Sequence, residues 1–159
     1  MASSEAPFQL KDLLTPATIR LHVAASDPGQ VIREAGQLLL ASGAIEERYI
    51  EAMQQALQTY GPYMVIVPGV ALLHARPGDG VKRPCMSLLT LEPPVRFGNE
   101  DNDPVSIAIA FGAVDRQKHL QALTMLTRLL ADEQALAAIR ASTSAEEVMH
   151  TIAASPSTQ

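Results

Sequence analysis

Two of the four histidines in this chain of 159 residues stand where apolar segments give way to polar ones. His74 directly follows the apolar run 70–73, and His119 comes shortly after the apolar run 105–113. Ligand sites collect where the carboxyl ends of parallel strands meet at one edge of a sheet. Both histidines are therefore candidate site residues.

The residue types around these histidines favour phosphorus chemistry. A neutral imidazole, with a pKa of about 6.5, offers a free lone pair at neutral pH. Arg76 follows His74, and Arg116 and Lys118 precede His119, so positive charge gathers locally in an otherwise acidic chain. A phosphoryl group held on nitrogen needs hydrogen-bond donors around its oxygens. His74, Arg76 and His119 would provide a nucleophile and such donors.

Other chemistries find less support in the sequence. It contains no GxSxG, GxxxxGK[ST] or GxGxxG motif, so a serine-hydrolase elbow and the usual nucleotide-binding loops are not indicated. It also lacks HxH, HxxxH and CxxC spacings. A metal-dependent hydrolase built on His74, Asp79 and His119 stays as a third hypothesis, although the adjacent Arg76 would repel a cation. We expect no metal and no cofactor.

The single cysteine, Cys85, raises the question of a second nucleophile. Its neighbours Lys82 and Arg83 would lower the pKa of the thiol. The C-x5-R type of phosphate loop is missing, however, and we interpret Cys85 as structural. One cysteine forms no internal disulfide, which favours a reducing compartment.

The composition indicates a soluble cytoplasmic domain. Apolar residues make up 47% of the chain, and the formal net charge is −5. This acidic balance argues against binding to nucleic acid or to an anionic membrane. The sequence has no apolar run of the roughly 18 residues that span a bilayer, and its start lacks the features of a secretory signal.

Helical patterns come before, within and after a group of strands, which is typical of a mixed sheet covered by helices. We expect one α/β (α+β) domain over residues 1–159, with a five-stranded mixed sheet flanked by helices on both faces and flexible tails at 1–6 and 154–159. His22 and His150 fall on outer faces and are interpreted as solvated. The predicted strands are 19–23, 63–67, 70–73, 86–91 and 105–113. The predicted helices are 8–14, one that opens at Asp27 and Pro28 and ends at Gly43, 46–60, 119–130, 133–140, and one capped by Ser144 that ends near Ile152.

Three motifs resemble those of a known family. They are residues 69–74, which are similar to a GxAxPH phosphorylation segment, the loop of Phe97 and residues 100–105, and His119 at the opening of a helix. Together they resemble the mannitol/fructose-class enzyme IIA domain of the bacterial phosphoenolpyruvate-dependent sugar phosphotransferase system, most of all its ascorbate-type subgroup. The resemblance is strongest over residues 61–132.

The resemblance implies a mixed sheet flanked by helices and a phosphoryl-relay activity. His74 would take the group from the phosphohistidine of the carrier HPr and give it to a cysteine of an enzyme IIB partner, in the uptake of ascorbate-like substrates, pentitols or hexitols. His119 would help hold the phosphoryl oxygens, and Asn102 and Asp103 would shape the neighbouring loop. The two partners would bind transiently because they visit the same histidine in turn. The oligomeric state, a homodimer included, is left open.

Two departures from the family pattern affect this reading. Leu73 stands where the family usually has proline, and residues 53–60 lack the active-site arginine of mannitol-type members. The second departure favours the ascorbate-type subgroup and leaves Arg76 as a hypothetical substitute. We expect Leu73 and Phe97 to be exposed at the partner interface. The alternative function is a regulatory module of the same fold, whose phosphorylation state signals to a protein target rather than feeding a transporter.

Overall fold

The computed structural model describes residues 9–155, and in them five strands form one mixed sheet in the order β1-β4-β5-β3-β2. β1 pairs with β4, and β3 with β5, in parallel, whereas the β4–β5 and β2–β3 pairs are antiparallel. The predicted α/β class and five-stranded mixed sheet are confirmed. The strands are β1 (Ile19–Val23), β2 (Val65–Val67), β3 (Val70–Leu73), β4 (Cys85–Val95) and β5 (Val105–Gly112).

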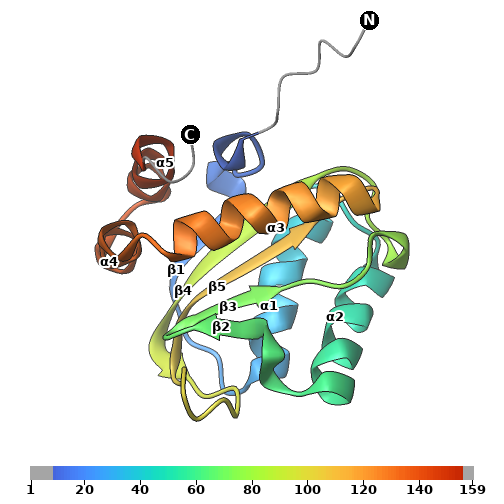
Figure 1. The fold of residues 1–159 in the computed structure, drawn as a ribbon, viewed down its shortest axis with the longest axis horizontal. Coiled ribbons are helices and arrows are strands. Elements are labelled where there is room, and N and C mark those ends of the chain that lie inside the picture. Colours follow the sequence, from blue (N-terminus) through green and yellow to red (C-terminus); the bar gives the residue numbers. More distant parts are fainter. Residues whose placement is uncertain (1–8, 156–159) are drawn as a thin grey trace, which may run out of the picture.

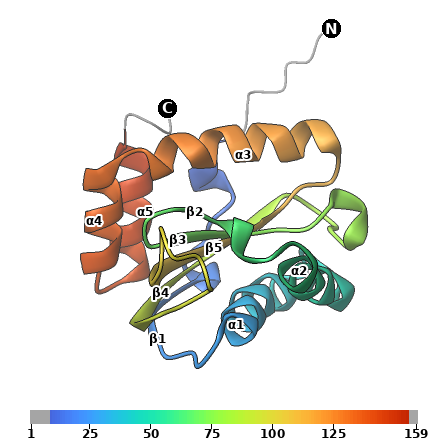
Figure 2. The same ribbon diagram turned by 60° about the horizontal axis from the view of Figure 1, so that its bottom comes forward.

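Helices cover both faces of the sheet, as Figures 1 and 2 show. α1 and α2 lie on one face, and α3, α4 and α5 lie on the other. The helices are α1 (Pro28–Ala41), α2 (Glu47–Tyr60), α3 (Arg116–Leu130), α4 (Glu133–Ala141) and α5 (Ala145–Ala154). Successive strand residues point to opposite faces, so Ala71 and Leu73 of β3 pack in the α1–α2 layer and Leu72 packs in the other. β3 is buried on both faces and forms a firm support for the residue that follows it.

Four of the five α-helices in residues 9–155 begin at a side-chain cap, and α2 is the exception. Asp27 caps α1, as predicted. At α3, the Oδ1 atom of Asp115 accepts the backbone N–H of Lys118 at 2.8 Å, which pairs a donor that helix geometry otherwise leaves free. The prediction that this helix begins at His119 is wrong, because the cap starts it at Arg116 and leaves His119 at the end of the first turn.

A two-residue turn, Pro68 and Gly69, joins β2 to β3. Gly69 has a φ of +80°, a left-handed conformation that glycine adopts without strain. β2 is shorter than predicted because Pro62–Met64 form a 3-10 helix before it. Proline has no N–H to give to a strand ladder.

Other boundaries also differ from the predictions. β4 extends to Val95, beyond the predicted strand 86–91, because Val95 pairs with Val105 of β5. In place of the predicted helix 8–14, the described residues contain a 3-10 turn at Leu10–Asp12. Of the predicted tails, 1–6 and most of 154–159 lie outside the described residues. Ala154 belongs to α5, and Ser155 is buried.

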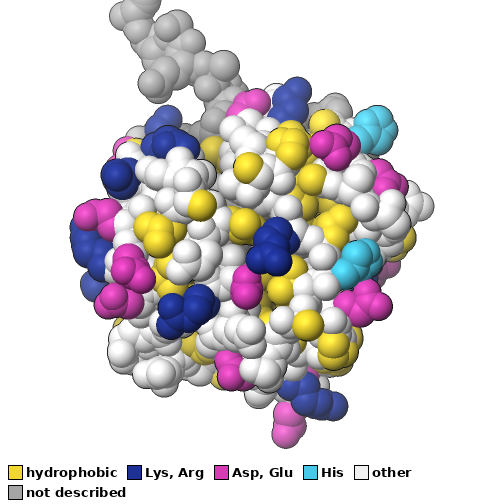
Figure 3. Space-filling model, turned by 180° about the vertical axis from the view of Figure 1, so that it is seen from behind, with side chains coloured by type: hydrophobic (Ala, Val, Ile, Leu, Met, Phe, Trp, Pro, Cys, Tyr) yellow, Lys and Arg dark blue, Asp and Glu magenta, His cyan; other side chains and the backbone are white. Residues whose placement is uncertain are grey.

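Within residues 9–155, none of the helices combines the length and the apolar character needed to cross a bilayer. On the face of the molecule shown in Figure 3, positive and negative side chains are interspersed rather than gathered by sign. Such a surface gives no extended positive track for a phosphate backbone.

Candidate functional site

His74 and His119 meet at one edge of the sheet. His74 directly follows β3, and His119 lies in the first turn of α3, the helix that follows β5. Because β3 and β5 are parallel, their carboxyl ends lie together. The two imidazole centroids are 5.6 Å apart, and the ring of Phe111 lies against both, at 5.2 Å from His74 and 5.3 Å from His119. The structure therefore brings the two candidate histidines into one site on an aromatic platform.

The hydrogen bonding of His74 fixes which nitrogen is free. Its Nδ1 atom lies 3.1 Å from the backbone carbonyl oxygen of Leu72, which only accepts hydrogen bonds. Nδ1 therefore carries the proton and Nε2 carries the lone pair. Burial lowers the pKa of His74; the Leu72 carbonyl acts in the opposite sense, and His119 adds to the lowering. The ring is thus held neutral, with a nucleophilic Nε2, in the pH range where free histidine begins to protonate.

In His119 the proton lies on the other ring nitrogen than in His74. Its Nδ1 atom is buried and has no hydrogen-bond partner among the described residues. An unpaired acceptor is tolerated in the interior better than an unpaired N–H group, so the proton is best placed on Nε2. Burial also lowers the pKa of His119. The second imidazole is therefore a neutral ring that can donate through Nε2–H.

Both rings line an open cavity of about 690 Å³ between α2, the loop after β3 and the start of α3. Its other wall includes Tyr60 and Tyr63, which are 72% and 45% exposed, and the ring of Tyr63 stands edge-on to His74 at 6.0 Å. The residues around the cavity are Ala52, Gln55, Ala56, Thr59, Tyr60, Tyr63, His74, Ala75, Arg76, Pro77, Asp79, Arg116 and His119.

The exposed apolar contacts near the site are not those predicted. Leu73 is fully buried because it points from β3 into the α1–α2 layer, and Phe97 is 7% exposed in the same layer. The prediction that these two residues are exposed is wrong. Besides the two tyrosines, the large exposed apolar side chains that flank the site in sequence are Val114 and Leu120.

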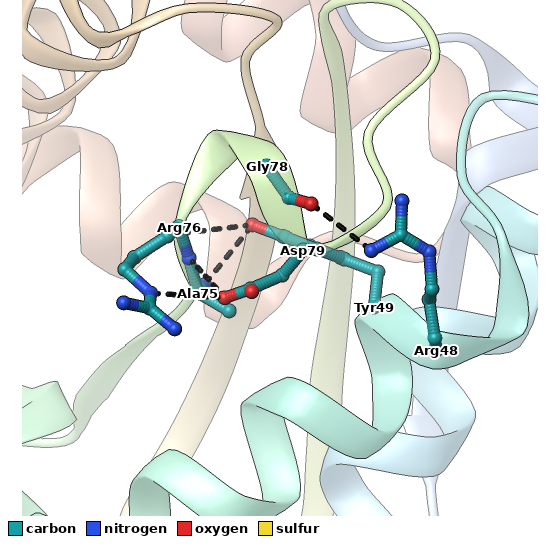
Figure 4. A network of polar contacts seen from close by, with 6 residues as sticks. All are labelled: Arg48, Tyr49, Ala75, Arg76, Gly78 and Asp79. Atoms are coloured by element: carbon teal, nitrogen blue, oxygen red, sulfur yellow. Dashed lines mark hydrogen bonds and ion pairs between the residues drawn. The ribbon is translucent and has the colours of Figure 1, made fainter.

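The third predicted residue, Arg76, lies at the cavity but points outward. Its side chain is 88% exposed, and its Nε atom pairs with Oδ2 of Asp79 at 3.4 Å. The same carboxylate oxygen accepts the backbone N–H of Arg76 at 3.0 Å, and Arg48 donates to the carbonyl of Gly78 at 3.0 Å. Figure 4 shows Asp79 binding Arg76 within the loop after His74 and Arg48 of α2 binding the same loop at Gly78. Arg76 thus has a local structural partner, and its long side chain is exposed enough to meet an anion in the cavity.

Asn102 and Asp103 are not brought to this site. They do shape their own loop: Asp103 accepts the backbone N–H groups of Phe97 and Gly98 at 2.9 and 2.8 Å. The carbonyl of Asn102 accepts the N–H of Gly69, in the turn that begins β3, at 2.8 Å. This loop therefore lies at the opposite end of β3 from His74, as Figure 1 also shows. The expectation that this loop neighbours the histidines is therefore wrong, because β3 and β5 separate the two.

Cys85 and Asp79 offer no second chemistry here. Cys85 is 5% exposed, and burial raises the pKa of its thiol to about 11. The thiol is therefore protonated at neutral pH and not a nucleophile, in line with the structural interpretation. Within residues 9–155, no group of three His, Cys, Asp or Glu side chains is arranged to hold a metal ion, so the geometry gives the metal-dependent hydrolase no support.

Sequence reasoning missed two aromatic residues of the site. Phe111 falls in an apolar pattern typical of core, and only the folded structure shows that its ring lies against both imidazoles. Tyr63 carried a weak signal, since it follows the break at Gly61 and Pro62.

Comparison with known proteins agrees with the geometry. Residues 12–155 match the family model described as phosphoenolpyruvate-dependent sugar phosphotransferase system, EIIA 2. The chain is 38% identical over 147 residues to the ascorbate-specific PTS system EIIA component of Salmonella choleraesuis, covering 91% of this chain and 96% of that relative.

Solved structures give the same result. The mannitol-specific cryptic phosphotransferase enzyme IIA CmtB from Escherichia coli superimposes with a TM-score of 0.83 at 32% identity, over 93% of this chain and 100% of that one. Enzyme IIA for mannitol from Escherichia coli, solved in complex with phosphorylated enzyme IIB, matches with a TM-score of 0.79 at 26% identity, over 89% and 98%. The chain belongs to the EIIA type 2 family of the phosphoenolpyruvate-dependent sugar phosphotransferase systems, and it is a phosphotransferase component of the phosphoryl relay.

Proposed function

We propose that His74 accepts a phosphoryl group on Nε2 from phosphorylated HPr and passes it, in the cytoplasm, to a cysteine of an ascorbate-type enzyme IIB. The observation that carries this assignment is the hydrogen bond from Nδ1 of His74 to the carbonyl of Leu72. It leaves Nε2 as the free nitrogen of a ring that lies 5.6 Å from a second imidazole at the cavity.

The two transfers balance in bonds and charge. In the first, the lone pair of His74 Nε2 forms a bond to phosphorus while the donor's N–P bond breaks and its electron pair returns to the donor imidazole. The Nδ1 proton stays on His74, so the phosphorylated ring is cationic and the carbonyl of Leu72 stabilises its charge. In the second, a thiolate attacks phosphorus and the N–P electron pair returns to Nε2, which restores the neutral imidazole.

His119 and the arginines would hold the phosphoryl oxygens. A donor that is fixed before the reaction stabilises charge without the cost of reorganisation. Nε2–H of His119 is such a donor, and Arg76 and Arg116 line the same cavity with positive charge. In this chain they would take the place of the arginine that residues 53–60 lack.

The partners would dock over the apolar rim of the cavity. Tyr60 and Tyr63 are exposed there by 72% and 45%, and exposed aromatic residues are enriched at protein interfaces. Leu120, which follows His119 in the sequence, is 53% exposed. The IIB complex known for the related mannitol enzyme IIA supports a IIB-type partner. The ascorbate-specific relatives support an ascorbate-like substrate for the transport system that this chain serves.

The test is transfer of label from radioactive phosphoenolpyruvate through enzyme I and HPr to the wild-type protein. We expect an acid-labile, alkali-stable label that maps to His74, and its onward transfer to an ascorbate-type IIB faster than to a mannitol-type IIB. Label on another residue would contradict the assignment of His74. Labelling without transfer to either IIB would favour the regulatory alternative.

A further inference from the structure

A buried tyrosine hydroxyl lies directly behind the two histidines. Tyr49 of α2 is fully buried in the α1–α2 layer. Its hydroxyl accepts the backbone N–H of Ala75 at 3.0 Å and donates to the carbonyl oxygen of Phe111 at 2.7 Å. Figure 4 shows the tyrosine reaching from the helix to the backbone of Ala75. One hydroxyl thus joins the ends of two strands.

The two backbone groups belong to the segments that carry the chemistry. Ala75 is the residue after His74, so its N–H sets the direction in which the chain leaves β3. Phe111 lies near the end of β5, and its ring contacts both imidazoles, at 5.2 Å for His74 and 5.3 Å for His119. Its ring packs in the layer on the α3 side of the sheet, whereas Tyr49 binds its carbonyl from the α2 side. The hydroxyl therefore ties the nucleophile's turn to the platform on which both rings rest.

A phenylalanine in place of Tyr49 would keep the ring packing and leave a buried N–H and a buried carbonyl without their partner. Burial raises the pKa of Tyr49 above its usual range, so the hydroxyl keeps its proton and remains a donor. Other contacts, such as Arg48 with Gly78, hold the loop farther along but do not reach Ala75.

We propose that Tyr49 is a positioning residue for phosphoryl transfer, whose hydroxyl sets the placement of His74 relative to Phe111 and His119. The proposal rests on the function assigned above to His74. A nucleophile misplaced by about 1 Å costs on the order of a hundredfold in rate. Tyr49 does not line the cavity, so its role is indirect and leaves the docking surface unchanged.

The test compares Tyr49→Phe with Ser87→Ala. Ser87 also buries a hydroxyl in the α1–α2 side of the sheet, where it donates to the carbonyl of Ala35 at 2.8 Å, away from the histidines. Both variants lose a buried hydroxyl, with two hydrogen bonds removed in Tyr49→Phe and one in Ser87→Ala, and thermal unfolding checks that both are folded. We expect Tyr49→Phe to lower kcat for transfer from phospho-HPr by about tenfold to a hundredfold with KM unchanged, and Ser87→Ala to leave both constants unchanged. Equal kcat values for the two folded variants would overturn the proposal.

Two further measurements do not depend on transfer. Nitrogen-15 NMR titration should show altered Nδ1 and Nε2 shifts of His74 in Tyr49→Phe and wild-type shifts in Ser87→Ala; unaltered His74 shifts would overturn the proposal. In the wild-type protein, the amide of Ala75 should exchange with solvent far more slowly than that of Gly78. Equal exchange rates would show that the hydroxyl does not hold Ala75. If the wild type accepts no phosphoryl group, the proposed function fails, and these two measurements still decide the positioning.

Discussion

The two ends of β3 and β5 differ in how their polar groups are paired. At the end where β5 begins, Asp103 accepts two backbone N–H groups and Asn102 binds the turn before β3, so the loop is closed by its own contacts. At the other end, Nδ1 of His119 is buried without a partner among the described residues, and Nε2 of His74 faces no fixed partner there. Unpaired buried polar groups are rare in folded proteins, so this end is less closed by internal contacts than the other. The most conspicuous polar motif of the chain thus serves its own loop, and the end that we propose as reactive has fewer internal contacts.

The largest expected effect is on labelling, and it should differ between a substitution at one end of β3 and a substitution at the other. We expect His74→Ala to abolish labelling from phosphoenolpyruvate and HPr, because no other described side chain at the cavity offers a free nucleophilic nitrogen with a fixed tautomer. Asp103→Ala should be labelled at the wild-type rate, since it lies at the opposite end of β3. Residual labelling of His74→Ala, or its loss in Asp103→Ala, would break the comparison.

The next effect distinguishes the role of His119 from that of His74. His119→Ala removes one fixed donor to the phosphoryl oxygens, and we expect onward transfer to IIB to slow by about a hundredfold. Labelling of His74 itself should survive. The control is His150→Ala, whose side chain is exposed on α5. Rapid-quench measurement of transfer to IIB checks this, and equal rates for the two variants would remove His119 from the mechanism.

A smaller effect concerns the stability of the structural end. Asp103→Ala leaves the N–H groups of Phe97 and Gly98 without their acceptor, and we expect it to lower the free energy of unfolding by about 1–3 kcal/mol. Urea unfolding measures this difference. A variant as stable as the wild type would mean that solvent replaces the carboxylate at no cost, and that this end is less tightly closed than we describe.

The smallest effect is the dependence of stability on pH. The pKa values of His74 and His119 are lowered in the folded state, mainly by burial. Below about pH 6.5 the unfolded chain therefore binds more protons than the folded one, and stability falls as the pH drops from 7 toward the lowered values. We expect the melting temperature to decline between about pH 6.5 and pH 5, and the decline to be weaker in the double variant His74→Ala/His119→Ala. An identical decline in that variant would assign it to other groups.

Much of the fold was predictable because local signals agreed with it. Asp27 capped its helix as expected, and the apolar runs 70–73 and 105–113 became central strands. His74 and His119 were also predictable, because each follows such a strand. The start of α3 was missed because Asp115 is a better cap than any residue next to His119. Leu73 and Phe97 were misjudged because exposure depends on which layer a side chain enters, which nearby residues do not reveal.

The family, the two strands that the histidines follow and the lack of a phosphate loop around Cys85 could all be inferred from the residues in order. The free nitrogen of His74, the position of Asn102 and Asp103 at the far end of β3, and the contacts of Tyr49 and Phe111 became visible only in the folded chain. Periodicity and helix caps act over a few residues. Sheet register, burial and hydrogen bonds instead join residues such as Tyr49 and Phe111, which stand in separate segments and meet only when the chain is folded.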